Sequence, residues 1–581
     1  MSLRHTANDI GLSPNGKALD SDSSIVGVRV PQAQSFIPRM IARDFLYYRT
    51  ICFGAKQIAM MADEKSLVRI SHRLFATSCS ETRISMNLSK LLEKLSYTLV
   101  SGSVETQVES LTSDSRKVRE NTAFVCIVGA VSDGHTYIQA AVEQKASVIV
   151  VQQGCKEEYL AQIPDTVTVV SVENTRYALA FMSAAYFDYP AEKLFTIGIT
   201  GTKGKTTTTY MIRNVLEACG IKTGLIGTIE TIIGDESWAS CNTTPESYQI
   251  HESFAKMVKA GCKAVVMEVS SQGLKLDRTA GILFDIGVFT NLEPDHIGPN
   301  EHASFEEYLA CKAKLFSQCK TGIVNADDKH TAEVIKNATC EIETYGLSEK
   351  AQLRACDICL KHERGTVGLT YRCTGALDMD VALNLPGKFS VYNSLCAIAV
   401  TRHFQVPQET LKKTLAEVKV KGRIELVKVS DEFSLMIDYA HNAMSLKSIL
   451  ETLKEYNPHR LVCVFGCGGN RSKERRFEMG EVSGKLADFT IITSDNPRFE
   501  DPEAIIEDIK TGISKTDGKY ISITDRKEAI RYAIEHGEPG DIIVLAGKGH
   551  EDYQEIKGVK HPMDERVLIA EVLKELAEKN V

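Results

Sequence analysis

A glycine-rich segment between an expected strand and an expected helix constrains the fold of this chain more than any other feature. The segment runs from Gly198 to Thr207 and reads G-I-T-G-T-K-G-K-T-T. The apolar run 194–197 precedes it, and residues 210–218 follow with a helical period that stops at Gly220. A strand, a glycine-rich turn and a helix in this order are typical of a parallel α/β sheet whose turn binds phosphate.

The same segment carries the groups that hold a nucleoside triphosphate. Its glycines let backbone N–H groups close on phosphate oxygens, Lys205 supplies a cation, and the Thr206 hydroxyl can reach Mg²⁺. The glycine spacing is G-x-x-G-x-x-G-K-T rather than G-x-x-x-x-G-K-T. A glycine-rich turn of purely structural use is the alternative, and the flanking strand and helix disfavour it. We therefore expect ATP and Mg²⁺ as cofactors.

The composition excludes several classes of protein. At 581 residues, 43% of them hydrophobic and 25% charged, the chain is ordinary for a soluble protein of about three or four domains. A formal net charge of −8 argues against nucleic acid as a partner. The 16 scattered cysteines fit reduced thiols in the cytoplasm, and we interpret the C-x-x-C of Cys356 and Cys359 as structural. No run of 18 apolar residues appears, so we expect no membrane insertion.

The pattern of strands and helices predicts three α/β domains after a dissimilar first segment. Residues 1–85 have no sustained period, and we expect disorder or an extension foreign to the fold, with a targeting peptide as the alternative. The predicted domains comprise residues 86–190, 191–421 and 422–581. Helices are predicted at 87–95 and 137–143, and strands at 123–128, 148–152, 167–172, 264–269, 285–290, 322–325, 461–465, 489–493 and 542–546.

Side chains that can bind a metal follow two predicted strands of the second domain. Glu268 lies near the end of one strand, and His296 lies just beyond another. In open α/β sheets, ligands bind at the carboxyl ends of the strands. With Thr206, these residues offer three candidate Mg²⁺ ligands, although histidine is an unusual ligand for so hard a cation. A capping acid and a surface histidine are the alternatives.

A series of short motifs follows the phosphate loop. In the second domain these are N-T-T-P at 242–245, M-E-V-S-S at 267–271, T-N-L at 290–292, D-H at 295–296 and A-C-K-A-K-L-F at 310–316. In the third they are G-R-I-E at 422–425, D-Y-A-H at 438–441, G-C-G-G-N-R at 466–471, D-N-P-R at 495–498 and G-K-G-H-E at 547–551. This series resembles the Mur ligases, and the resemblance spans about residues 86–581.

The resemblance implies an architecture and a reaction. The architecture is a mixed α/β domain that binds a UDP-linked substrate, a central domain with a parallel sheet of the P-loop ATPase type, and a C-terminal Rossmann-like domain. The reaction is ATP-driven amide formation through an acyl phosphate, because phosphorylation gives a carboxylate a leaving group. The implied substrates are UDP-N-acetylmuramoyl-L-alanyl-D-glutamate and meso-2,6-diaminopimelate, joined in peptidoglycan precursor synthesis by a cytoplasmic monomer.

Three alternatives remain open. The same reaction with L-lysine or another diamino acid is the nearest one. A folylpolyglutamate-type ligase is disfavoured by the UDP-type first domain. A non-catalytic nucleotide-binding relative would be expected to lose the phosphate-binding and metal-binding side chains, and these are retained.

The resemblance also implies which residues hold ATP and the metal. Lys312 matches the lysine that the family carbamylates, which converts a cation into a carboxylate-like metal ligand. Asn291 is implied to contact adenine, and Arg423 and Asp438 to reach ATP from the third domain as the domains close. The implied catalytic residues are Lys205, Lys312, Glu268 and His296, and the implied Mg²⁺ ligands are Thr206, Glu268, His296 and Lys312. The implied ATP contacts are Gly201, Thr202, Lys203, Gly204, Lys205, Thr206, Thr207, Asn291, Arg423 and Asp438.

The implied substrate contacts fall into two groups. Those for the UDP-linked dipeptide are Ser115, Thr243, Thr244, Ser270 and Arg278, and those for the amino acid are Arg471, Asp495, Asn496, Arg498, Gly547 and Glu551. D-N-P-R at 495–498 is the form seen in family members that add meso-diaminopimelate. An arginine can meet the distal carboxylate of this amino acid with two hydrogen bonds, and an acid can meet the distal ammonium.

Several positions depart from the family pattern. Lys203 stands where asparagine is usual, Gln272 where histidine is usual, and Leu276 where a polar side chain contacts the muramoyl group. Residues 297–302 and 442–444 also differ. Because the phosphate-binding and metal-binding residues are retained, these departures bear on substrate contacts more than on the reaction.

Overall fold

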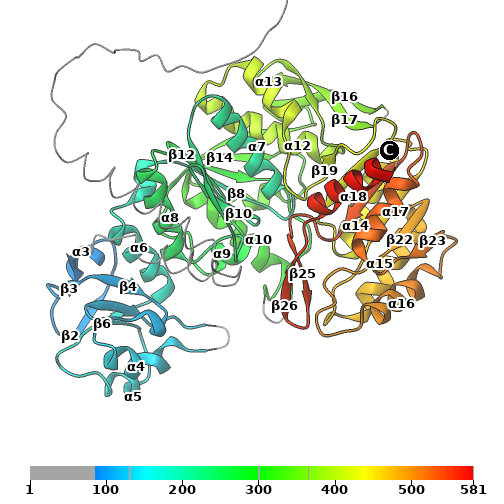
Figure 1. Cartoon of the computed structure of the whole chain (residues 1–581). Helices are drawn as coiled ribbons and strands as arrows, with labels where there is room; N and C mark the ends of the chain where they lie inside the picture. The colour runs from blue at the N-terminus through cyan, green and yellow to red at the C-terminus, as the bar shows by residue number, and fades with distance from the viewer. Residues whose placement is uncertain (1–84, 130–131, 299–300, 364, 580–581) are drawn as a thin grey trace, which may run out of the picture. The chain divides into compact units, whose positions relative to one another are not determined.

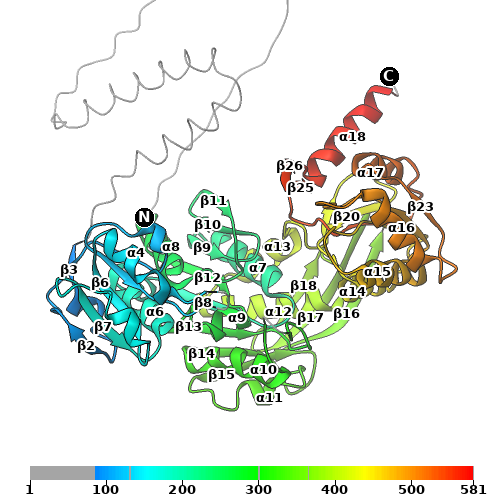
Figure 2. The same cartoon turned by 90° about the horizontal axis from the view of Figure 1, so that it is seen from below.

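Three large β-sheets, which follow one another along the sequence, form the framework of the described chain (Figures 1 and 2). The computed structural model describes residues 85–129, 132–298, 301–363 and 365–579. The prediction for residues 1–85 therefore concerns a segment that, apart from Ser85, lies outside the described residues. Each large sheet is mainly parallel and is covered by helices, which confirms the predicted α/β fold class.

The first sheet and its helices occupy residues 86–186. Their elements are β1 (Met86–Asn87), α3 (Leu88–Leu91), β2 (Thr98–Ser101), β3 (Gln107–Val108), β4 (Ser110–Thr112), β5 (Thr122–Val125), α4 (Ile138–Glu143), β6 (Ala146–Gln152), α5 (Glu157–Leu160), β7 (Thr168–Val172) and α6 (Thr175–Tyr186). The strand order of the sheet is β2-β7-β6-β5-β4, with only β2 antiparallel to its neighbour, while β1 and β3 form a separate antiparallel pair. Apolar residues of α3 and α6 pack on one face and those of α4 on the other.

The helix predicted at 87–95 is shortened to the single turn α3. Leu88, Leu91 and Leu92 are buried, whereas Leu95 lies in the following turn and is half-buried. One turn already brings the three buried leucines into the core. The helical spacing of the sequence is therefore satisfied without a longer helix, which would be marginal on its own.

The second sheet and its helices occupy residues 195–417. Their elements are β8 (Phe195–Thr200), α7 (Lys205–Ala218), β9 (Thr223–Ile226), β10 (Glu230–Ile233), β11 (Glu236–Ala239), α8 (Ser247–Lys259), β12 (Ala264–Glu268), α9 (Ser271–Lys275), β13 (Phe284–Phe289), α10 (Phe305–Ala313), β14 (Cys319–Asn325), α11 (Thr331–Val334), β15 (Glu341–Gly346), β16 (Leu353–Glu363), β17 (Thr366–Gly375), β18 (Met379–Leu383), α12 (Lys388–Thr401) and α13 (Gln408–Glu417). The strand order is β11-β10-β9-β12-β8-β13-β14-β15-β16-β17-β18.

The position of β8 within this sheet determines where a site can form. β8 lies between β12 and β13 and is parallel to both, so the loops after these three strands lie at one edge. The predicted strands at 264–269, 285–290 and 322–325 are confirmed as β12, β13 and β14. Residues of α7, α12 and α13 pack on one face and those of α8 and α10 on the other, so the central strands are buried on both sides.

Antiparallel strands at both edges of the second sheet were not predicted. β10 and β11 form a hairpin at one edge, and β16, β17 and β18 extend the other. In β16, only Leu353 and Ala355 are buried and the remaining positions alternate between half-buried and exposed, so no continuous apolar run marks the strand in the sequence. Cys356 and Cys359 lie on β16 on either side of an irregularity in its pairing with β17.

The third sheet and its helices occupy residues 425–579. Their elements are β19 (Glu425–Val427), β20 (Ser434–Asp438), α14 (Ala443–Lys454), β21 (Leu461–Phe465), α15 (Lys473–Leu486), β22 (Phe489–Ile492), α16 (Pro502–Ile513), β23 (Tyr520–Ser522), α17 (Arg526–Glu535), β24 (Ile542–Ala546), the hairpin β25 (Tyr553–Ile556) and β26 (Val559–Pro562), and α18 (Glu565–Lys579). The strand order is β19-β20-β24-β21-β22-β23, parallel except for β19. Residues of α14, α15 and α16 cover one face and those of α17 and α18 the other.

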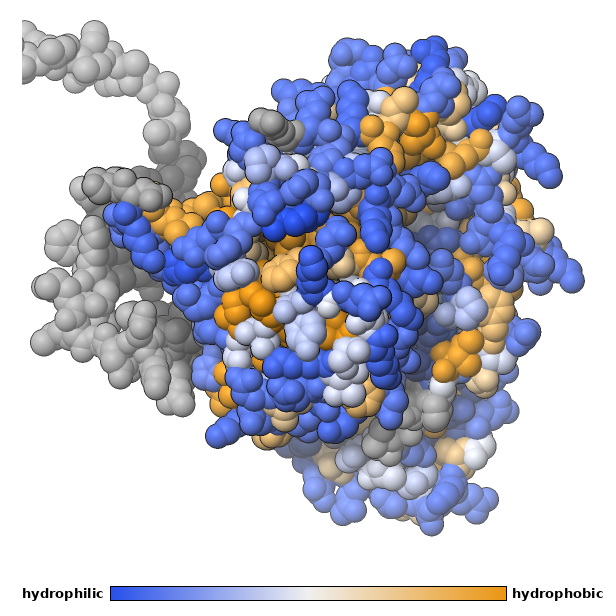
Figure 3. Space-filling model, turned by 90° about the vertical axis from the view of Figure 1, so that its right-hand side faces the viewer, coloured by the Kyte–Doolittle hydropathy of each residue, from blue (hydrophilic) through white to orange (hydrophobic). Residues whose placement is uncertain are grey.

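Hydrophilic residues cover most of the face of the described chain drawn in Figure 3, and several small groups of apolar residues lie between them. Among the described residues, no helix combines the length and the apolar character that crossing a membrane requires.

Candidate active site

The phosphate loop joins β8 to α7 and depends on two glycines with positive φ. The φ angle is 148° at Gly201 and 84° at Gly204. A Cβ atom on Gly201 would lie 1.9 Å from Oγ1 of Thr290, and one on Gly204 would lie 2.4 Å from Oδ1 of Asn393. Both distances are too short for non-bonded atoms, so these positions require glycine. The loop ends at the N-terminus of α7, where N–H groups and the helix dipole favour an anion.

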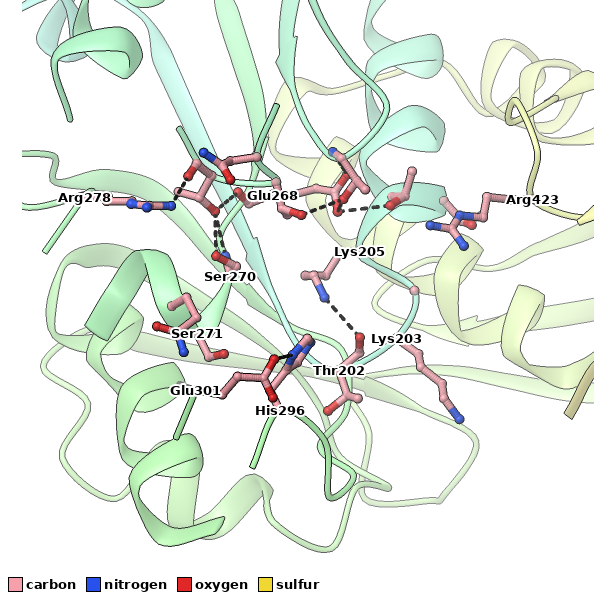
Figure 4. A pocket seen from close by; sticks show the side chains of 18 residues that line it. Thr202, Lys203, Lys205, Glu268, Ser270, Ser271, Arg278, His296, Glu301 and Arg423 are labelled. Atoms are coloured by element: carbon pink, nitrogen blue, oxygen red, sulfur yellow. Dashed lines mark hydrogen bonds and ion pairs between the residues drawn. The ribbon is translucent and has the colours of Figure 1, made fainter. Parts of the chain in front are cut away.

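Two side chains just beyond β13 hold the loop in place. The Lys203 N–H donates to Oδ1 of Asn291 at 2.9 Å, and Nδ2 of Asn291 donates back to the Lys203 carbonyl at 3.0 Å. Oγ1 of Thr290 donates to the same carbonyl at 2.7 Å. The Lys203 side chain points away from Lys205 (Figure 4), and its Nζ lies 2.7 Å from Oε2 of Glu293. The departure from the family pattern at Lys203 thus leaves the loop backbone held by Asn291.

Two lysines donate to one carbonyl of this loop. Nζ of Lys205 lies 2.8 Å from the Gly201 oxygen and 3.0 Å from the Thr202 oxygen, and Nζ of Lys312, on α10, lies 2.8 Å from the Gly201 oxygen. Lys312 is 2% exposed, and its Nζ lies 4.6 Å from the centroid of the Tyr308 ring. Burial lowers the pKa of Lys205, and burial together with Lys205 holds the pKa of Lys312 well below its usual value. Lys312 therefore has a larger neutral, nucleophilic fraction than an exposed lysine.

Glu268, at the end of β12, forms an oxygen-rich cluster beside the loop. Its Oε2 accepts hydrogen bonds from the hydroxyls of Thr206 and Thr228, both at 3.0 Å. Its Oε1 accepts one from the Thr228 N–H at 2.8 Å. The side chain is almost fully buried. A buried carboxylate surrounded by hydroxyl oxygens is a donor set that suits a hard divalent cation.

A second polar network follows β12. Oγ1 of Thr244 donates to the Glu268 carbonyl at 2.9 Å and accepts from the Ser270 N–H at 2.9 Å. Oγ of Ser270 in turn caps α9 by accepting from the Gly273 N–H at 3.0 Å. Nη1 of Arg278 donates to the Thr244 carbonyl at 2.9 Å. Oγ1 of the neighbouring Thr243 lies 3.0 Å from Oγ1 of Thr228, which itself contacts Glu268. The four predicted dipeptide contacts of the second sheet therefore lie close together, namely Thr243, Thr244, Ser270 and Arg278.

His296 is oriented by a carboxylate that the sequence analysis did not assign. Its Nδ1 lies 3.0 Å from Oε1 of Glu301, and its side chain is 52% exposed. If Nδ1 carries the proton that is donated to Glu301, Nε2 keeps a lone pair for a ligand. The buried His302 holds the segment: its N–H donates to the His296 carbonyl at 3.0 Å, and its Nε2 lies 2.9 Å from Oγ of Ser271.

A cavity of about 430 Å³ collects most of these side chains (Figure 4). The predicted residues that line it are Thr202, Lys203, Gly204, Lys205, Thr206, Thr207, Thr243, Thr244, Glu268, Ser270, Arg278, His296 and Arg423. The residues that line it without having been assigned as contacts include Thr228, Ser271, Gln272 and Glu301. Gly201 and Lys312 are not part of its lining.

An adjoining cavity of about 400 Å³ shares Lys203, Gly204, Thr207 and Arg423 with the first. It adds two further predicted nucleotide contacts, Asn291 and Asp438, and is also lined by apolar and aromatic side chains that include Tyr345, Leu385, Phe389, Tyr392 and Ile449. The Arg423 guanidinium lies 5.0 Å from the centroid of the Tyr439 ring. Burial raises the pKa of Asp438, although Arg423 opposes the shift. An aromatic wall beside a phosphate loop suits a planar base.

A third cavity, of about 140 Å³, lies at the carboxyl ends of β21, β22 and β24. All six predicted amino-acid contacts line it, namely Arg471, Asp495, Asn496, Arg498, Gly547 and Glu551. The other side chains in its wall include Tyr439, His441, Arg475 and Arg476. Guanidinium groups that suit carboxylates and acids that suit ammonium groups therefore surround one small space.

Arg498 is held in place by its own neighbours. Its φ is 52°, its Nη1 donates to the Gly469 carbonyl at 2.7 Å, and its Nε lies 3.1 Å from Oε2 of Glu555. The hairpin of β25 and β26 contributes Glu555, so a segment about 60 residues away in sequence orients the guanidinium. A guanidinium fixed in this way loses little freedom when it binds a carboxylate.

Ser115, Gly201 and Lys312 are the predicted residues that line none of the three cavities, and of these only Ser115 belongs to the first sheet. Ser115 is in a short turn after β4 in the first sheet, where its carbonyl accepts a hydrogen bond from Nε2 of Gln144 at 3.1 Å. Sequence reasoning also missed supporting side chains, namely Thr228, Glu301, Tyr308, Asn393 and Lys548. Thr228 follows the end of β9, so the rule about strand ends could have found it.

Comparison with known proteins agrees with this arrangement. Residues 107–187 match the description "Mur ligase family, catalytic domain", residues 199–401 "Mur ligase middle domain" and residues 422–549 "Mur ligase, glutamate ligase domain". In Clostridium acetobutylicum, the protein named UDP-N-acetylmuramoyl-L-alanyl-D-glutamate--2,6-diaminopimelate ligase 1 is 44% identical over 494 residues, which cover 84% of this chain and 100% of that protein. Caldanaerobacter subterraneus has a ligase of the same name without the numeral. It is 42% identical to this chain, and the alignment covers 84% of this chain and 99% of that protein.

Solved structures are similar over a comparable share of the chain. One of a UDP-N-acetylmuramoyl-L-alanyl-D-glutamate--2,6-diaminopimelate ligase has a TM-score of 0.64 at 28% identity, covering 85% of this chain and 100% of its own. A UDP-N-acetylmuramoylalanyl-D-glutamyl-2,6-diaminopimelate--D-alanyl-D-alanyl ligase from Acinetobacter baumannii has a TM-score of 0.54 at 16% identity and covers 85% of this chain and 100% of its own, a likeness of fold alone.

Proposed function

Since the chain belongs to the Mur ligase family, we propose that it joins meso-2,6-diaminopimelate to UDP-N-acetylmuramoyl-L-alanyl-D-glutamate with the hydrolysis of ATP to ADP and phosphate. The observation that carries the amino-acid assignment is the third cavity. Arg471 and Arg498 line it together with Glu551, so a carboxylate and an ammonium can be met in one place. The relatives that carry this name match over almost their full length.

The proposed reaction proceeds in two steps. The γ-carboxylate of the D-glutamate residue attacks the γ-phosphate of ATP, forming the acyl phosphate and releasing ADP. The amine of diaminopimelate then attacks the acyl carbon, the amide bond forms, and phosphate leaves. Lys205 and the other residues of the phosphate loop that line the first cavity are proposed to stabilise the charge of the transferred phosphoryl group. The first and third cavities are assigned to the acceptor carboxylate and the amine, respectively.

The donor set around Glu268 fits Mg²⁺. The buried carboxylate and the hydroxyl of Thr206 are hard oxygen ligands, and His296 is oriented by Glu301 with one ring nitrogen left over. We propose Thr206, Glu268 and His296 as ligands of the metal, together with Lys312 once it carries a carbamate. A bound Mg²⁺ would supply positive charge between the phosphates and the carboxylate. Without a bound metal, Glu268 accepts hydrogen bonds from the hydroxyls of Thr206 and Thr228.

Lys312 is proposed to be the carbamylated lysine. Its amine is buried, has a lowered pKa and lies against the loop carbonyl of Gly201. A neutral amine adds to carbon dioxide, whereas an ammonium cannot. The product is a carboxylate-like group that can accept hydrogen bonds or bind a metal. After carbamylation, an anion would lie next to the Lys205 cation, whereas two cations lie side by side without it.

The remaining assignments concern organisation. We propose that residues 86–190, with Ser115, bind the UDP-linked substrate, that 191–421 bind ATP, and that 422–581 bind the amino acid. Arg423 and Asp438 come from the third of these and line the nucleotide cavity, which supports closure of the third domain on ATP. We also propose that the chain acts as a monomer. Cytoplasmic activity is supported by the cysteines of the described residues, which are all free thiols.

The test of this proposal is ADP release in the presence of the UDP-linked dipeptide and one amino acid at a time. We expect ADP release with meso-diaminopimelate, and much less with L-lysine, which lacks the distal carboxylate that a guanidinium would bind. Turnover with L-lysine but not with meso-diaminopimelate would contradict the amino-acid assignment. ATP binding without ADP release for any acceptor would contradict the assignment as a ligase.

A further inference from the structure

Lys548 is a buried cation that stands behind the wall of the third cavity. It follows β24, it is 0% exposed, and it does not itself line the cavity. Its Nζ donates to Oδ1 of Asn496 at 3.0 Å and to Oε2 of Glu551 at 2.8 Å. The Tyr553 carbonyl is its third acceptor. All three donor sites of the ammonium are therefore used by the protein, and none is left for a substrate.

The amide of Asn496 has only one orientation that satisfies its neighbours. Its Oδ1 accepts from Nζ of Lys548 and also from the Glu555 N–H at 2.8 Å. Its Nδ2 donates to Oε2 of Glu551 at 2.9 Å. Two donors aimed at one atom of an amide require that atom to be oxygen. Lys548 thus helps to turn the Asn496 amide so that its NH₂ group faces Glu551.

The two oxygens of Glu551 consequently differ. Oε2 accepts from both Lys548 and Asn496. Within the described part of the chain, no hydrogen bond to Oε1 is found. Burial opposes ionisation of this carboxyl, but the pKa of Glu551 is lowered overall by Lys548 and Asn496. Glu551 lines the cavity, so an ionised carboxylate with one uncommitted oxygen faces the space where the amino acid is proposed to bind.

We infer that Lys548 is a positioning residue for the amino-acid site: through Asn496 and Glu551 it presents one carboxylate oxygen to the distal ammonium of the amino acid. This inference rests on the proposed function in taking the third cavity as the amino-acid site. It concerns the ammonium, which meso-diaminopimelate and L-lysine share. It is therefore separate from the question of which of them is used.

The test is the substitution Lys548→Met, which keeps an unbranched side chain but removes the ammonium. We expect the KM for the amino acid to rise on the order of 10- to 100-fold, the effect of losing hydrogen bonds to a charged group. The KM values for ATP and the UDP-linked dipeptide should stay unchanged, and kcat at saturating amino acid should be largely kept. A merely structural role would instead lower the active fraction and affect all three substrates alike.

Lys560→Met is the matched control. Nζ of Lys560 lies 3.9 Å from the centroid of the Tyr553 ring and that of Lys548 lies 5.0 Å from it, but Lys560 is exposed and belongs to β26. Both substitutions remove an ammonium group that lies near the Tyr553 ring, but only Lys548→Met also removes the hydrogen bonds to Asn496 and Glu551. We expect Lys560→Met to keep the wild-type KM for the amino acid.

Two results would overturn the inference. An unchanged amino-acid KM in folded Lys548→Met overturns it, as does an equal rise in the control. If Lys548→Met does not fold, Lys548→Gln decides by the same comparison, because its neutral amide has two donors and cannot serve the three acceptors of the ammonium. If the wild-type enzyme uses L-lysine instead of meso-diaminopimelate, the proposed specificity fails and the KM comparison is made with L-lysine. If the wild type releases no ADP at all, the proposed function fails, and calorimetric binding of meso-diaminopimelate to the wild type and Lys548→Met tests Lys548 on its own.

Discussion

The carbonyl of Gly201 receives hydrogen bonds from two lysines that arrive from different helices. Lys205 begins α7, and Lys312 lies on α10 more than a hundred residues later. Two ammonium groups at one acceptor repel each other, which is one reason why the pKa of Lys312 is lowered. Removal of one positive charge at Lys312, or its conversion to a negative one, relieves that repulsion.

A substitution at Lys312 tests this at the level of a single residue. We expect Lys312→Ala to lose nearly all ADP release, because the proposed carbamate cannot form. Formate or acetate should restore part of the activity, since a small carboxylate can occupy the space of the missing group. Lys314→Ala is the control: this lysine is two positions further on and its side chain is 49% exposed. Full activity of Lys312→Ala would contradict the carbamate assignment.

Residues in short local patterns were predicted better than residues that support them from a distance. Lys205, Thr206 and Glu268 could be found because a loop motif or a strand end marks each one. Asn393 and Tyr308 could not, because they meet the phosphate loop only through tertiary packing of α12 and α10. Lys548 lies inside a recognised motif, yet nothing in the sequence indicates that it is buried.

At the scale of elements, the buried parallel strands were the predictable part. β21 is a continuous apolar run, and β12 and β13 are apolar apart from Glu268 and Asp285, because both faces of these strands are covered by helices. The antiparallel β16 and β17 escaped prediction because much of β16 alternates between half-buried and exposed residues, and polar side chains interrupt the apolar residues of both strands. The hairpin of β25 and β26 is largely exposed. It nevertheless supports the third cavity, because Glu555 accepts a hydrogen bond from Arg498 and the Tyr553 carbonyl accepts one from Lys548.

The turn from β8 to α7 allows a test at this scale. Gly201→Ala forces a side chain into a positive-φ position and against Oγ1 of Thr290, which also holds the Lys203 carbonyl. We expect a loss of about 1–3 kcal/mol in the free energy of unfolding and a raised KM for ATP. Chemical denaturation and ADP-release kinetics measure the two effects.

Gly220→Ala provides the matched comparison for this turn. Gly220 also has positive φ, 75°, but a Cβ atom there would meet nothing within 4 Å. It should lose about 1–2 kcal/mol from the left-handed backbone alone and keep the wild-type KM for ATP. An equal KM for ATP in Gly201→Ala and Gly220→Ala would contradict the role given to the close packing of the loop.

At the scale of the whole molecule, the family matches lie between residues 107 and 549, and the curated relatives align with 84% of this chain and almost all of their own length. All cavities assigned to substrates are built from residues 202–551. We therefore expect a chain that begins at Met86 to keep nearly full activity. ADP release by the shortened and the full chain, at equal active-site concentration, measures this. A large loss would mean that residues 1–85 take part in substrate binding or catalysis.

The central claim is that ATP hydrolysis is coupled to the addition of one particular amino acid to the UDP-linked dipeptide. The most direct measurement is product analysis by mass spectrometry after reaction with ATP, the dipeptide and an equimolar mixture of meso-diaminopimelate and L-lysine. The account predicts a single new nucleotide product, heavier than the dipeptide by diaminopimelate less one water, formed in equal amount to ADP. A lysine-containing product, or ADP formed without any new amide, would contradict it.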